Sequence, residues 1–287
     1  MSALSDAFKV KVQYFLPKTI ISRLVGKIAS AEMGKVTTWL IKNFIKYYNV
    51  DMQDAEITDI NSYKSFNDFF TRHLKTGARP IISDKNILTE PVDGTISEFG
   101  NIYKDAVIQA KGHYYSLEAL LGGNHEDAQS FEDGRFLTVY LSPRDYHRVH
   151  MPIEGKLRKM IFVPGELFSV NPLTARNVDN LFARNERVVC FFENEQIGEF
   201  AVIMVGATIV ASISTVFAGI VAPQGKNIKV YDYQKENISL NKGDELGMFL
   251  LGSTVITVFP KDKVEFDEDL AKNATVKMGS KFGRIKN

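Results

Sequence analysis

Residues 200–225 read FAVIMVGATIVASISTVFAGIVAPQG, and the fold depends on how this uncharged stretch is interpreted. It is long enough for a helix that crosses a bilayer. However, β-branched residues are frequent in it, and Gly206, Gly219 and Pro223 interrupt it. These features favour two or three buried strands over one long helix. We therefore predict strands in this stretch and no membrane span.

The sequence around this stretch has a similar β character. Short β-branched runs alternate with glycine, proline and aspartate, and residues 136–141 and 254–259 are predicted strands. One helical patch is expected at residues 116–121. Cys190 lies in an apolar run and is interpreted as a core residue. The predicted fold class is α+β, with a predominantly β core domain.

The N-terminal part has a different, helical pattern. Apolar residues recur with helical spacing from Ile20 to Ile28, and aromatic and aliphatic residues are frequent from Trp39 to Tyr48. Lysines accompany both stretches. We predict a basic amphipathic helical segment for membrane association over residues 1–60 and a second domain over residues 61–287.

The formal net charge of +1 hides an asymmetry between these two parts. Residues 1–50 carry seven lysines and one arginine against two acidic residues, a net +6, so the remaining residues carry −5. No basic pattern typical of nucleic-acid binding accompanies this charge, so we expect no nucleic-acid partner and favour a membrane surface. The alternative, that these helices simply dock on the domain, stays open. The single cysteine excludes an intramolecular disulfide and a zinc site made of several thiolates.

Three short elements supply the residue types of a base-activated nucleophile. Gly252-Ser253 directly precedes a predicted strand, His147 and His150 follow another, and Asp93 lies in a Pro/Gly turn. Each element alone has an ordinary explanation, because turns commonly contain glycine, serine and aspartate. The two histidines lack a third ligand at the spacing of a metal site, so no metal is expected. Together the elements could form a nucleophile with its base, and only geometry decides whether they do.

In their order along the chain, these elements resemble those of the phosphatidylserine decarboxylases, specifically the shorter bacterial type. The likeness covers nearly the whole chain and is weakest over the basic N-terminal part. The segments that carry it are residues 91–94, 141–152, 162–171, 180–187 and 251–254. The resemblance implies a pyruvoyl-dependent, self-processing enzyme that converts phosphatidylserine into phosphatidylethanolamine.

The resemblance also implies how the catalytic site is made. Ser253 is expected to attack the carbonyl of Gly252, which cuts the chain into a large chain, 1–252, and a small chain, 253–287, held together as a heterodimer. Ser253 then becomes the covalent cofactor, a pyruvoyl group (pyruvate), whose ketone forms a Schiff base with the serine amine of the lipid. His150 is expected to take the Ser253 proton, and Asp93 is expected to fix the His150 imidazole.

Further roles follow from the resemblance to an enzyme that acts on a bilayer lipid. His147 is the candidate for assisting protonation of the carbanion, with a pocket-shaping role as the alternative. Arg184 and Arg187 are candidate contacts of the lipid phosphate, although structural arginines are more common. We expect a peripheral protein on the cytoplasmic side of the bacterial inner membrane, with a higher oligomer left open.

Two other functions stay open on the residues alone. A serine hydrolase would keep one intact chain with a free Ser253, whereas self-processing produces two chains. A non-enzymatic lipid-binding protein would show no decarboxylation and no dependence on Ser253.

Overall fold

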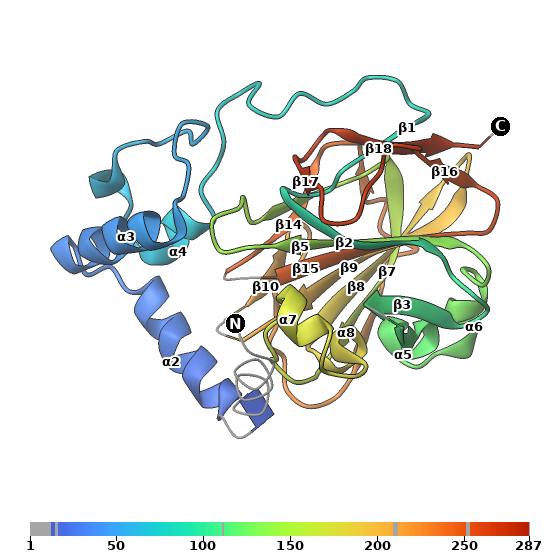
Figure 1. The fold of residues 1–287 in the computed structure, drawn as a ribbon, viewed down its shortest axis with the longest axis horizontal. Helices are drawn as coiled ribbons and strands as arrows, with labels where there is room; N and C mark the ends of the chain where they lie inside the picture. The colour runs from blue at the N-terminus through green and yellow to red at the C-terminus, as the bar shows by residue number, and fades with distance from the viewer. Residues whose placement is uncertain (1–12, 15–16, 111, 209–211, 251–252, 287) are drawn as a thin grey trace.

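The structure is a computed structural model that describes residues 13–14, 17–110, 112–208, 212–250 and 253–286. Figure 1 shows a body of β-sheets with short helices and, on one side of it, a group of helices from the N-terminal part. These are α2 (Lys18–Ser30), α3 (Lys35–Tyr48) and α4 (Phe66–Phe70). The α+β class with a β-dominated core is therefore confirmed.

Antiparallel pairing builds the body around one large sheet. In the described part of the chain its strands follow the order β12-β7-β8-β9-β15-β5-β2-β17, and β13 also pairs with β7. The predicted strands at 136–141 and 254–259 are β5 and β15, which are neighbours inside this sheet. The strands are β2 (Gly94–Asn101), β5 (Arg135–Leu141), β7 (Gly155–Val163), β8 (Arg187–Asn194), β9 (Gly198–Gly206), β12 (Lys229–Asp232), β13 (Ser239–Leu240), β15 (Ser253–Phe259) and β17 (Thr275–Val276).

Smaller sheets and short helices cover the two faces of the large sheet. One small sheet has the order β11-β10-β14-β6, another has the order β1-β18-β16, and β3 pairs with β4. Their strands are β1 (Ile87–Thr89), β3 (Ala106–Ala110), β4 (His113–Ser116), β6 (Arg148–His150), β10 (Ile213–Thr215), β11 (Gly219–Ala222), β14 (Glu245–Phe249), β16 (Val264–Phe266) and β18 (Lys281–Ile285). The short helices are α5 (Leu117–Leu121), α6 (His125–Gln129), α7 (Pro172–Ala175) and α8 (Leu181–Arg184).

Alternate residues of the central strands enter two different cores. Val255 lies in a core shared with β6, β10 and β14, whereas Ile256 lies in the core beneath α5, α7 and α8. Because both faces are covered, the strands are nearly continuous apolar runs instead of alternating ones. Cys190 is fully buried in the first core, as predicted, and burial raises the pKa of its thiol to about 12.

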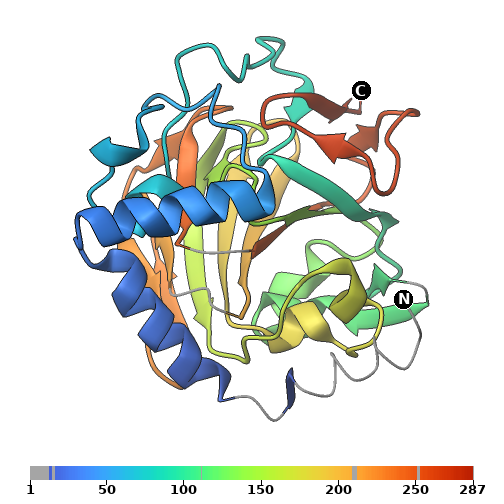
Figure 2. The same ribbon diagram turned by 60° about the vertical axis from the view of Figure 1, so that its left-hand side comes forward.

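The N-terminal helices have a small core of their own. Ile41 of α3 is fully buried and packs in one cluster with Tyr63, Phe69 and Phe70. A 3₁₀ turn (Ile60–Ser62) precedes α4, and Ser65 caps α4 in a capping box. Figure 2 shows α2 and α3 meeting at an angle in front of the sheets. This small core includes residues after the predicted boundary at residue 60, because α4 packs against the N-terminal helices.

The uncharged stretch 200–225 forms strands where the structure describes it, as predicted. It contains most of β9, then β10 and β11, and residues 209–211 lie outside the described residues. In the described ranges, no helix is long and apolar enough to cross a membrane.

Candidate active site

Ser253 is the first residue of β15, which lies between β9 and β5 in the large sheet. It pairs with Leu141 on β5 and with Gly206 on β9. Its side chain is fully buried, and its Oγ has no hydrogen-bond partner among the described residues. An unpartnered buried hydroxyl costs free energy, and the hydroxyls of Thr254 and Thr257 on the same strand share this state, so what distinguishes Ser253 is its position directly after Gly252. Gly252, on the other side of the expected cut, lies outside the described residues.

His147 bonds the residue that follows the end of β5, the strand that pairs with Ser253. Leu141 pairs with Ser253, and the next carbonyl, that of Ser142, is 3.1 Å from His147 Nε2. This contact requires a proton on Nε2, so the neutral ring presents a bare Nδ1, which is buried without a partner. Burial lowers the pKa of His147 to about 3. The ring of Phe70 stacks on the imidazole at 4.1 Å between centroids, so α4 forms one wall of this region.

His150 is the last residue of β6, and both of its ring nitrogens have partners. Nδ1 is 2.8 Å from the carbonyl oxygen of Gly243, and Nε2 is 3.1 Å from the hydroxyl of Tyr146. The carbonyl can only accept, so Nδ1 carries the proton and the Tyr146 hydroxyl donates to Nε2. Burial lowers the pKa of His150, which favours the neutral form that can accept a proton. The backbone N–H of His150 donates to the carbonyl of Pro91 at 2.8 Å, which brings the turn before β2 beside this histidine.

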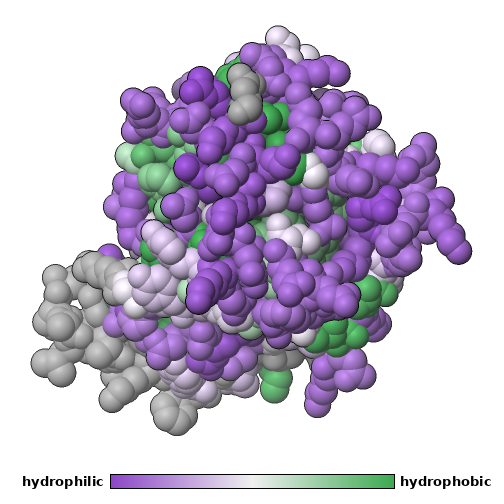
Figure 3. Space-filling model, turned by 90° about the vertical axis from the view of Figure 1, so that its right-hand side faces the viewer, coloured by the Kyte–Doolittle hydropathy of each residue, from purple (hydrophilic) through white to green (hydrophobic). Residues whose placement is uncertain are grey.

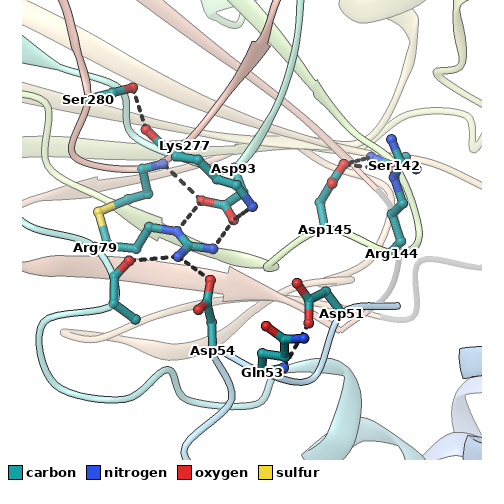
Figure 4. A network of polar contacts seen from close by, with 12 residues as sticks. Asp51, Gln53, Asp54, Arg79, Asp93, Ser142, Arg144, Asp145, Lys277 and Ser280 are labelled. Carbon is teal, nitrogen blue, oxygen red and sulfur yellow. Dashed lines mark hydrogen bonds and ion pairs between the residues drawn. The ribbon is translucent and has the colours of Figure 1, made fainter. Parts of the chain in front are cut away.

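Asp93 lies in that turn, almost fully buried, and Arg79 holds its carboxylate (Figure 4). Arg79 Nε is 2.9 Å from Asp93 Oδ1, and Arg79 Nη2 is 2.6 Å from Asp93 Oδ2. The backbone N–H of Met278 also donates to Oδ1 at 2.9 Å, and Lys277 Nζ lies 3.4 Å from Oδ2. Within the described part of the chain, no hydrogen bond joins Asp93 to His150.

The expected Asp93–His150 hydrogen bond is therefore replaced by other contacts in this structure. The carbonyl of Gly243 fixes the His150 tautomer, and the guanidinium of Arg79 occupies the Asp93 carboxylate with two nearly parallel N–H groups. Such a charge-assisted fork is stronger than a hydrogen bond from a neutral imidazole, which is consistent with Arg79 and not His150 holding the carboxylate here. The two residues remain close, because the turn of Asp93 is bonded to the backbone of His150 through Pro91.

The two arginines proposed as phosphate contacts have different surroundings. Arg187 is almost fully buried, and its guanidinium donates to the carbonyl oxygens of Ala119, Leu120, Ala183 and Asn185. These carbonyls lie at the ends of α5 and α8, where helices leave acceptors unpaired. The structure therefore does not support Arg187 as a phosphate contact and gives it a structural role instead.

Arg184 is partly exposed, with its Nη2 2.7 Å from Glu166. Its guanidinium also lies 4.9 Å from the centroid of the Phe168 ring. Lys18 of α2 bonds the same Glu166 carboxylate at 2.9 Å. Arg184 thus takes part in a contact between the N-terminal helices and the body, and its role toward a phosphate stays a prediction.

Two residues in this region had no predicted role. Arg79 holds Asp93 from a segment without regular secondary structure, and Tyr146 donates to His150 from within the same short motif. The spacing of four residues between Tyr146 and His150 could have suggested their contact. No sequence pattern links Arg79 to Asp93.

The sequence matches known proteins over almost all of its length. A family model described as phosphatidylserine decarboxylase matches residues 66–284. The chain belongs to this family. A second family model, described as PSD, matches residues 8–49, which covers much of the helical segment of this family member.

Individual relatives agree with this family. A "Phosphatidylserine decarboxylase proenzyme" from Shewanella sediminis is 55% identical over 287 residues, with 98% of this chain and 100% of the relative covered. Proteins of the same name from Pseudoalteromonas translucida and Psychromonas ingrahamii are 56% and 53% identical, over 98% and 96% of this chain and 98% and 97% of their own lengths. The family suggested by the sequence motifs is thus confirmed.

Proposed function

We propose that this chain decarboxylates phosphatidylserine after cutting itself between Gly252 and Ser253. The observation that carries the proposal is the Ser253 hydroxyl, buried without a partner among the described residues at the first residue of a central strand. The relatives support it, because they are named phosphatidylserine decarboxylase proenzymes, and a proenzyme must be converted before it acts.

The cut requires only groups of the chain itself. His150 removes the proton from Ser253 Oγ, which attacks the Gly252 carbonyl and exchanges the peptide bond for an ester. For this step His150 Nε2 must exchange its present partner, Tyr146, for Ser253. Elimination then releases the Gly252 carboxylate and leaves a dehydroalanine, which loses ammonia on hydrolysis to give the pyruvoyl group at residue 253.

The surroundings of Ser253 suit this group. A pyruvoyl group supplies an electron-accepting ketone for decarboxylation, and the residue that would become it is fully buried, away from bulk water. His147 bonds the carbonyl of Ser142, the residue after the Leu141 that pairs with Ser253, and it has an unpartnered Nδ1. We assign His147 a supporting role in the protonation that replaces carbon dioxide. Burial lowers its pKa to about 3 and keeps the ring neutral, so its bare Nδ1 accepts a hydrogen bond from the proton donor and orients that donor instead of giving up a proton itself.

Intact mass spectrometry tests the proposed function. Purified protein should contain two polypeptides, 1–252 and 253–287, and the small one should lack a free amine at its start. Ser253→Ala should stay uncut and inactive, whereas the matched control Ser239→Ala, at an exposed position on β13, should be cut normally. An active preparation that contains only the intact chain would overturn self-cleavage and favour a serine hydrolase. A protein that binds the lipid but releases no carbon dioxide would favour a binding protein.

We also propose that the N-terminal helices attach the protein peripherally to the cytoplasmic side of the bacterial inner membrane. Large apolar side chains on α2 and α3 are exposed, among them Leu24 at 59%, Trp39 at 62% and Tyr47 at 81%. Exposed lysines occur on the same helices. Figure 3 shows the opposite side of the body, where hydrophilic residues predominate. Aromatic side chains mixed with lysines suit a membrane interface that carries anionic lipid.

Charge reversal tests this attachment. Lys27→Glu, Lys42→Glu and Lys46→Glu together should weaken binding to vesicles that contain phosphatidylserine, since each lysine near such a surface contributes about 1 kcal/mol. Lys18 is excluded from this set because it already pairs with Glu166. Self-cleavage should continue, because the substituted residues lie away from Ser253. The matched control reverses the same number of exposed lysines on the body that form no ion pair with the described residues: Lys85, Lys235 and Lys263. If the helix variant binds these vesicles as well as the unchanged chain does, the attachment lies elsewhere.

A further inference from the structure

Arg79 connects three parts of the chain through one buried guanidinium (Figure 4). Its side chain is 8% exposed. Two of its nitrogens bond both oxygens of Asp93, and Nη1 lies 2.7 Å from Asp54 Oδ2, in the segment that follows α3. Nη1 also donates to the carbonyl of Ala78 at 2.7 Å, which fixes the guanidinium against its own backbone.

The turn that carries Asp93 is held on its other sides mainly by backbone groups. Pro91 accepts from the N–H of His150, and Glu90 exchanges hydrogen bonds with the backbone of Gly279 and Ser280. Met278 donates its N–H to the carboxylate. These contacts place the turn, but among the described side chains that bond Asp93, Arg79 alone takes both carboxylate oxygens. Lys277 is the other side-chain partner, at a longer 3.4 Å, and it is 60% exposed.

The neighbouring Glu90 shows what happens to a carboxyl in this turn without such a partner. Glu90 is 1% exposed, and neither oxygen of its side-chain carboxyl has a hydrogen bond to a described residue. Burial raises its pKa to about 8. A buried carboxylate keeps its charge only when a cation or several donors compensate it. Asp93, three residues away, has such a cation in direct contact, because Arg79 bonds both of its carboxylate oxygens.

We propose that Arg79 is a positioning residue for self-cleavage, which fixes the orientation of the Asp93 carboxylate beside His150. The proposal rests on the self-cleavage proposed above and on the expectation from the sequence that Asp93 supports His150. In this structure that support runs through the backbone contact between Pro91 and His150 and not through a direct hydrogen bond. It adds that the support depends on a residue outside the motifs, one that also bonds Asp54. Docking of the segment after α3 thereby contributes to the geometry of the cutting site.

Cell-free synthesis of the full chain, followed by gel electrophoresis over time, measures the rate of the cut. Arg79→Ala should slow it by about 10- to 100-fold, the range expected when charge-assisted hydrogen bonds are lost. The rate of Arg79→Lys should lie between those of Arg79→Ala and the unchanged chain, because an ammonium keeps the positive charge but cannot make the two parallel hydrogen bonds. Asp54→Asn should slow the cut by no more than about fivefold, since the Asp54 side chain is half exposed. Arg158→Ala, which removes a surface pair with Glu193, is the matched control and should cut normally.

Chemical rescue separates positioning from folding. Adding guanidinium ion at millimolar concentration to Arg79→Ala should restore part of the rate, and it should not accelerate Arg158→Ala or Asp93→Asn. Circular dichroism and the unfolding midpoint show whether each variant is folded. If Arg79→Ala does not fold, the test rests on Arg79→Lys alone. A rate of self-cleavage in Arg79→Lys equal to that of the unchanged chain then overturns the proposal.

The other outcomes are equally distinct. A folded Arg79→Ala chain that cuts at the normal rate or faster overturns the proposed role of Arg79. If Asp93→Asn stalls in the same experiment, the proposed function stands while this inference fails. If Asp93→Asn also cuts normally, the support of His150 by Asp93 is wrong as well.

Discussion

The buried Glu90 carboxyl should make the protein less stable as pH rises. Burial raises its pKa from 4.5 to about 8, and none of the described groups bonds to its side-chain oxygens. The folded protein therefore keeps a proton that the unfolded chain loses above pH 4.5. Between pH 4.5 and about 8, unfolding releases this proton, so stability decreases with increasing pH, and above that range the full loss is reached.

The size of the effect follows from the shift. At 1.36 kcal/mol per pKa unit, a rise from 4.5 to about 8 corresponds to on the order of 5 kcal/mol. This is a large part of the 5–15 kcal/mol that typically separates folded from unfolded protein (a rough range). The side chain cannot easily turn to solvent, because the backbone of Glu90 bonds to Gly279 and Ser280 on either side.

Urea unfolding of Ser253→Ala, which keeps the chain in one piece, measures the effect. Adding Glu90→Gln should change little near pH 5 and should stabilise the protein by several kcal/mol near pH 9, since the amide does not ionise. Glu90→Met should be more stable at every pH, because it also removes two unpartnered oxygens. The exposed Glu195→Gln is the control. Parallel stability profiles for the chains with and without the Glu90→Gln substitution across this pH range would refute the reasoning.

Other predictions concern the histidines, one arginine and metal ions. His150→Ala should stall self-cleavage, whereas His147→Ala should still cut at least in part and decarboxylate poorly. Gel electrophoresis measures the cut, and carbon dioxide release measures the decarboxylation. The opposite pattern would exchange the roles of the two histidines. Arg187→Met should lower stability by about 2–4 kcal/mol, because buried carbonyls lose their donors. An unchanged unfolding midpoint would contradict its structural role. EDTA should leave the rate of the cut unchanged, since the proposed cut uses only groups of the chain itself. Inhibition that added metal reverses would contradict this.

The strands and helices could largely be predicted because their patterns are local. Residues 254–259 are rich in β-branched side chains and form most of β15, and the patch at 116–121 forms α5 with Ser116 as its N-cap. The described parts of the stretch 200–225 form strands, in keeping with the glycines and Pro223 that interrupt any long helix. The order of the strands in the large sheet could not be predicted. It depends on pairings between distant segments, such as β5 with β15, that no local pattern encodes.

The residues of the candidate site could be named, but their partners could not. The motifs singled out Asp93, His150 and Ser253, and the structure places their segments in one region. The partner of Asp93 proved to be Arg79, from a segment without regular structure, because a guanidinium fork outcompetes an imidazole for a carboxylate. Arg187 shows the reverse case. Its position in a family motif suggested a ligand contact, and its burial against helix-end carbonyls shows a structural function.

The central position of β15 changes the molecularity of folding once the chain has been cut as proposed. Before the cut, the chain folds in a unimolecular reaction. After it, the small chain supplies β15 between β5 and β9, and β18 between β1 and β16. Without β15, the large chain would present two open strand edges, which are prone to aggregation. An unfolded mature protein would have to recover its native sheet by a concentration-dependent encounter of two chains. The working lifetime of the mature protein should therefore be set by how slowly it unfolds, and not by how well it refolds.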